Sequence, residues 1–117
     1  MAIEGVMRAG HVQIRVMDLD AARKHYTEYY GMIEVARDPH RVYLKAWDEF
    51  DHHSLVLRES DEPGMDHVAF KVRNEADLDR IEGELAERLI GVTRIAAGEQ
   101  AGMGRRIAFT VPTGHRV

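Results

Sequence analysis

The sequence of 117 residues contains no cysteine, which excludes disulfide bonds, a thiolate nucleophile and any metal site built on cysteine. No stretch approaches the roughly 18 consecutive apolar residues of a membrane-spanning helix, and the first residues lack the apolar core of a signal peptide. An excess of positive charge is also missing, since 16 Lys and Arg stand against 20 Asp and Glu. These absences argue against nucleic-acid and membrane partners and make the cytoplasm the expected location. Length and an ordinary composition indicate a single globular domain over residues 1–117.

What the sequence does contain is a duplication. Residues 10–16 and 66–72 both read as His, apolar, any residue, apolar, basic, apolar, with His11 and His67 at equivalent places 56 positions apart. In each copy a helical pattern follows. The second half of the chain therefore repeats the first.

The first copy predicts one strand, one helix and three strands. Val12, Ile14 and Val16 face one side of the first strand, and His11, Gln13 and Arg15 face the other. Asp18 is the expected N-cap of the helix and Gly31 its stop. The three strands are expected at about 33–37, 42–47 and 54–58.

Residues 62–64 form the expected linker to the second copy. There Val68, Phe70 and Val72 are expected inside, and Asn74 caps a helix. The apolar stripe of this helix consists of Leu78, Ile81, Leu85 and Leu89. Strands follow at about 92–96 and 106–111, and a last strand begins at His115 after a turn at 112–114.

This order predicts an α+β fold of two tandem βαβββ modules, about 5–61 and 65–117. Together they would form a curved mixed sheet, a cup with the helices outside. Three residues after the last turn are too few for a strand of about 5 residues. We therefore expect a truncated last strand and a natural chain that continues beyond Val117; the alternative is a short final strand in a complete protein.

His11 and His67 are the leading candidates for a metal site. Each opens the first strand of its copy on the polar side, so symmetric packing would direct both imidazoles into one hollow. Two imidazoles and one carboxylate form the facial triad of non-haem Fe(II) oxygenases. The carboxylate is missing here, so the site would be degenerate, and the alternative is that each His only hydrogen-bonds at a strand end.

Three further features are weaker candidates. Tyr43, Lys45 and Trp47 alternate along the third strand and would line the cup or form an interface that another domain covers, which we favour. His52 and His53 lie in an acidic turn and are expected to be solvated. The glycines and arginines of residues 102–106 predict a hairpin loop rather than a phosphate site.

The sequence also resembles a known family. Residues 5–16, 41–47, 57–66, 104–106 and 112–115 are similar, in the same order, to the opening of the catechol 2,3-dioxygenases, or metapyrocatechases. The similarity extends over essentially the whole chain.

The resemblance implies the vicinal oxygen chelate fold, also called glyoxalase-like, with two such domains in each subunit. It further implies an Fe(II)-dependent extradiol dioxygenase that opens catechol-type rings with dioxygen, usually as a homotetramer. The family's Fe(II) ligands lie in the second, catalytic domain, so this chain would be the non-catalytic amino-terminal domain, inactive alone and without a cofactor. Its partners would be the carboxy-terminal domain, further copies of the subunit and, for the whole enzyme, a small aromatic diol.

Two relatives of the same fold offer alternatives. One is a freestanding protein that sequesters a ligand, as bleomycin-resistance proteins do. The other is a glyoxalase-type enzyme, but Val56 stands where those relatives place a metal-binding Glu, which argues against that chemistry.

Overall fold

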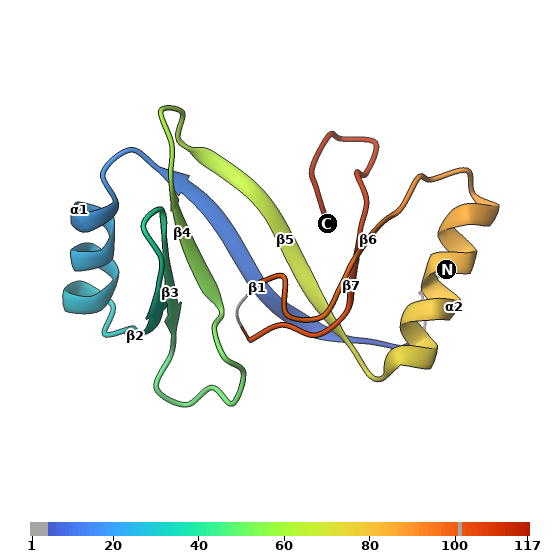
Figure 1. Ribbon diagram of the computed structural model, residues 1–117, viewed down its shortest axis with the longest axis horizontal. Helices are drawn as coiled ribbons and strands as arrows, with labels where there is room; N and C mark the ends of the chain where they lie inside the picture. The colour runs from blue at the N-terminus through green and yellow to red at the C-terminus, as the bar shows by residue number, and fades with distance from the viewer. Residues whose placement is uncertain (1–4, 101) are drawn as a thin grey trace. The chain divides into compact units, whose positions relative to one another are not determined.

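The computed structural model describes residues 5–100 and 102–117, which form two compact units. One unit is Gly10–Val68; the other consists of the described residues before Gly10 together with Ala69–Val117. Their elements follow the chain in Figure 1. Seven strands form a five-stranded sheet in the order β2-β3-β4-β1-β5 and a two-stranded sheet of β6 and β7.

Gly10–Val68 contains most of the larger sheet. Its elements are β1 (Val6–Val16, which begins before the unit), α1 (Leu19–Lys24), the π-helical turn η1 (His25–Tyr29), β2 (Ile33–Arg37), β3 (Arg41–Lys45), β4 (Leu55–Glu59) and the start of β5 (Gly64–Val72). β1 runs parallel to β4, whereas β3 is antiparallel to both β2 and β4. The mixed sheet with its two helices confirms the predicted α+β class.

The core of this unit lies on one face of the sheet. Its buried side chains come from alternating positions of β3 and β4: Val42, Leu44, Leu55 and Leu57. Val12, Ile14 and Val16 of β1 pack against them, as the alternation predicted, and α1 closes the layer with Leu19 and Ala22. The polar side chains of β1 consequently lie on the opposite face of the sheet.

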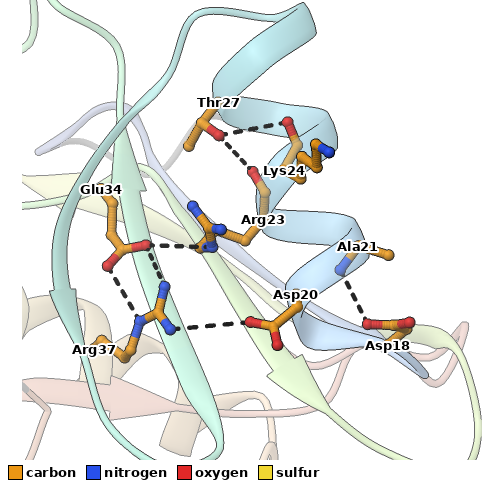
Figure 2. A network of polar contacts seen from close by, with 8 residues as sticks. All are labelled: Asp18, Asp20, Ala21, Arg23, Lys24, Thr27, Glu34 and Arg37. Carbon is orange, nitrogen blue, oxygen red and sulfur yellow. Dashed lines mark hydrogen bonds and ion pairs between the residues drawn. The ribbon is translucent and has the colours of Figure 1, made fainter.

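The helix that covers this core is fastened at its start and along its side (Figure 2). The carboxylate of Asp18 accepts a hydrogen bond from the Ala21 amide at 3.0 Å, which confirms the predicted N-cap. Arg37 of β2 binds Glu34 at 2.7 Å and reaches Asp20 at 4.0 Å. The hydroxyl of Thr27 donates back to the Arg23 carbonyl, at the point where the α-helix becomes the π turn. Gly31 has a positive φ of 73°, in accord with a helix stop.

The other unit contains α2 (Glu75–Glu87), β6 (Thr93–Ile95) and β7 (Arg106–Ala108). The side chain of Asn74 accepts a hydrogen bond from the Asp77 amide at 2.8 Å, so the second predicted cap is also confirmed. β6 and β7 are antiparallel, and both are shorter than expected. After the turn at 112–114 the chain pairs back, with a single bridge between Thr110 and Arg116.

Two predicted core positions of this unit are wrong. Leu78, Ile81 and Leu85 are buried, but Leu89 is 94% exposed because α2 ends before it and its φ of 61° turns the chain away from the helical path. Phe70 is 49% exposed on β5, so the alternation that places Val68 and Val72 partly inside does not bury it.

Candidate functional site

The polar face of the Gly10–Val68 sheet carries the candidate site. Pairing of β1, β4 and β3 places Gln13 opposite Val56, and Val56 opposite Tyr43. Residues paired across strands point to the same side, so all three lie on the face away from the core. Gln13, Val56 and Tyr43 are nevertheless buried, which means that this face is also covered.

His11 and His67 meet on this face. Their Nε2 atoms lie 2.9 Å apart and the rings are nearly perpendicular, with an interplanar angle of 85°. The predicted convergence of the two imidazoles is therefore confirmed. At this distance one Nε2 donates a proton and the other accepts it, because two protonated nitrogens cannot share a hydrogen bond.

A third histidine that sequence reasoning assigned to solvent lies beside them. His53 is only 2% exposed, its ring centroid lies 5.2 Å from that of His11, and Tyr43 packs edge-on against it. The expectation of a solvated turn is wrong for His53, and His52 contacts it through Nδ1 at 2.9 Å. The burial of His53 follows from the parallel pairing of β1 with β4, which brings the two strand starts together, and the Val12 amide bonds to the carbonyl of Ser54.

Next to the histidines is a charged network centred on Asp66. Its carboxylate accepts hydrogen bonds from Arg58 at 2.6 Å and from Gln13 at 2.7 Å, and Arg15 lies at 3.5 Å. The hydrogen bond from Arg58, strengthened by that from Gln13, lowers the pKa of Asp66 from 3.8 to about 2, although partial burial opposes the shift. Asp66 is therefore ionised and paired with its cationic neighbours.

The remaining sequence candidates do not share one environment. Tyr43 is buried against the histidines, Lys45 is the last residue of β3, and Trp47 lies beyond the strand with 81% of its surface exposed. A common face for all three is therefore wrong, because β3 ends two residues early. Their role as lining or interface residues stays a prediction. Residues 102–105 lie in the connection from β6 to β7, where Arg105 binds Asp79 at 3.0 Å, and Arg106 begins β7.

The metal chemistry available to this chain is limited. Within residues 5–100 and 102–117, no group of three or more His, Asp or Glu side chains could hold a metal ion. His11 and His67 supply two donors, and Asp66 is occupied by arginines. The described residues thus do not fit a complete two-His, one-carboxylate centre. No helix in the same described residues is long and apolar enough to cross a membrane.

Comparison with known proteins shows which enzymes this chain resembles. Residues 65–117 match the family model for the catechol 2,3-dioxygenase-like N-terminal domain. Over 96% of its length the chain is 50% identical to a metapyrocatechase from Pseudomonas sp. strain CF600. The crystal structure of the 2,3-dioxygenase LapB from Pseudomonas sp. KL28 superposes on 98% of the chain with a TM-score of 0.93 and 40% identity. This chain is a relative of the extradiol dioxygenases.

As such a relative, the chain corresponds to only part of the known enzymes. It spans 37% of the Pseudomonas metapyrocatechase and 40% of LapB, in their amino-terminal portion. Over 94% of its length the chain is also 26% identical to a manganese-dependent 2,3-dihydroxybiphenyl 1,2-dioxygenase from Geobacillus genomosp. 3. The resemblance noted in the sequence is confirmed, together with the vicinal oxygen chelate fold.

Proposed function

We propose that this chain is the non-catalytic amino-terminal domain of a longer, two-domain extradiol dioxygenase that opens catechol-type rings with dioxygen. The observation that carries the proposal is the 50% identity to a metapyrocatechase of which the chain spans 37%. On the polar face His11 and His67 converge, and among the described residues no carboxylate forms a group of three metal donors with them.

The ring-opening metal would then be held by the carboxy-terminal domain of the same subunit. Fe(II) is our choice, and the manganese-dependent relative makes Mn(II) the alternative. When bound, such a metal supplies open coordination positions for a catecholate and for dioxygen. The role left to this chain is structural: it supports the catalytic domain and contributes to a homo-oligomer in the cytoplasm. Exposed Trp47 and half-buried Lys45 are candidate contact residues for these partners.

The test compares the 117-residue chain with the protein encoded by the uninterrupted reading frame. Both are loaded with Fe(II), and separately with Mn(II), and given catechol in air, and formation of the yellow ring-opened product is followed by its absorbance. We expect product from the longer protein and none from the chain alone. Turnover by the chain itself would disprove the division of labour. A longer protein inactive with both metals would disprove the activity, and a reading frame that stops at Val117 would favour a freestanding ligand-binding protein.

A further inference from the structure

We propose that His11 and His67 form a two-imidazole chelate for a divalent transition-metal cation within this chain. The site is separate from the ring-opening centre placed above in the other domain. The proposal rests on the polar face of the Gly10–Val68 unit, which contains both residues. It does not depend on the dioxygenase activity of a longer protein.

The spacing of the two nitrogens, which their hydrogen bond sets, can be compared with the spacing of two ligands on one metal ion. The Nε2 atoms are 2.9 Å apart. With metal–nitrogen bonds of about 2.05 Å, this spacing corresponds to an angle of about 90° at the metal. Two ligands of a tetrahedral ion would be separated by about 3.3 Å at the same bond length. The pair can therefore occupy adjacent positions of a square-planar or octahedral ion without a change in spacing, whereas tetrahedral zinc would require the two nitrogens to move apart.

The framework around the pair restrains it. The two histidines come from β1 and β5, which are neighbours in the sheet. The hydrogen bond from Gln13 to Asp66 joins the same two strands, and Arg58 holds Asp66 from β4. Ligands on paired strands vary less in position than ligands on loops, so little reorganisation opposes metal binding.

Metal binding would replace the hydrogen bond between the two imidazoles and involves a tautomeric shift. In the hydrogen-bonded pair one imidazole carries its proton on Nε2. If that proton moves to Nδ1, both Nε2 lone pairs are presented to the metal and the ring charges do not change. The other coordination positions go to water or to a small exogenous ligand, because no third donor completes a cluster among the described residues. Imidazole donors in tetragonal geometry favour Cu(II) and Ni(II).

The test uses Cu(II) as the probe, added below one equivalent to the 117-residue chain. Electron paramagnetic resonance should show hyperfine structure from two nitrogens, and calorimetry should give one site per chain. His11→Gln and His67→Gln should each weaken binding at least tenfold. His40→Gln is the matched control, because His40 is an exposed histidine of the same unit whose imidazole lies 3.9 Å from the carboxylate of Glu59.

Each result of these experiments either supports the two-histidine site or rules it out. Binding that survives both substitutions, or that is lost in His40→Gln, would overturn the site and indicate surface histidines instead. If His11→Gln fails to fold, as judged by circular dichroism, the half-buried His67→Gln and the nitrogen count of the unaltered chain carry the test. A spectrum with one nitrogen or none in the unaltered chain would also overturn it.

Discussion

Replacement of Asp66 by asparagine should destabilise the chain in a manner that depends on pH. The substitution keeps the shape of the side chain and its ability to accept the hydrogen bond from Gln13. It removes the negative charge that faces Arg58 at 2.6 Å and Arg15 at 3.5 Å. Both arginines would then remain on a partly covered face without their shared counter-ion, so the folded state loses more than the unfolded state.

The magnitude follows from the pKa. The folded chain holds the pKa of Asp66 at about 2, below the ordinary 3.8. A depressed pKa contributes stability that is present above the unfolded value and lost as the pH falls through the folded one. At about 1.36 kcal/mol for each unit, Asp66 contributes about 2 kcal/mol at pH 7 and about 1 kcal/mol at pH 3. The destabilisation caused by Asp66→Asn should therefore shrink by about half between these two pH values.

Urea unfolding followed by far-ultraviolet circular dichroism at pH 7, 5, 4 and 3 measures this difference. Asp61→Asn is the matched control, because it removes an equal charge from an exposed position in the β4–β5 connection, shortly before Asp66 of β5. Its effect should stay below about 0.5 kcal/mol at every pH. The loss in free energy of unfolding caused by Asp66→Asn could instead be the same at pH 3 as at pH 7, or no larger than that of the control. Either result would refute the conclusion that ionised Asp66 stabilises the fold by pairing with the arginines.

Three other substitutions test the fold. Asp18→Ala should lower the free energy of unfolding by about 1 kcal/mol through loss of the α1 cap, and Asp18→Asn, which can still cap, should restore most of it. Leu57→Ala should cost about 2–5 kcal/mol by opening a cavity in the core, whereas Leu89→Ala should be nearly neutral; equal losses in urea titrations would contradict the assigned core. Gly5→Ala should lower the melting temperature, because Gly5 has a φ of 93° and an added Cβ would lie 2.6 Å from Cγ of Asp77; an unchanged melting temperature would contradict this close approach.

The elements that follow from local physics were predictable from the sequence. Asp18 and Asn74 cap helices by their own side chains, and the alternation in β1 separates Val12 and Ile14 from the polar residues. Both signals depend on neighbours in the chain. Errors appear where tertiary context decides, as at Leu89, where the helical period continues in the sequence but the backbone has already left the helix.

The site was predictable only in part, for the same reason. Duplication paired His11 with His67, because equivalent positions in a repeat occupy equivalent positions in the fold. His53 has no counterpart in the repeat, and its neighbours Asp51 and His52 read as a solvated turn. Its burial follows from the parallel pairing of β1 with β4, a contact between segments about 40 residues apart that no local pattern records.

The division into compact units has a practical consequence for anyone who wishes to halve this domain. The repeat boundary lies near residues 62–64, but the boundary between the units lies inside β1 and β5, so residues 5–9 belong with the later half of the chain. The amide of Arg73 bonds to the carbonyl of Gly5 at 2.9 Å, and a cleavage at the repeat junction would remove that acceptor. A peptide that begins at Met65 would lack a strand it needs, whereas a circular permutant that keeps residues 5–9 joined to the later half would retain it.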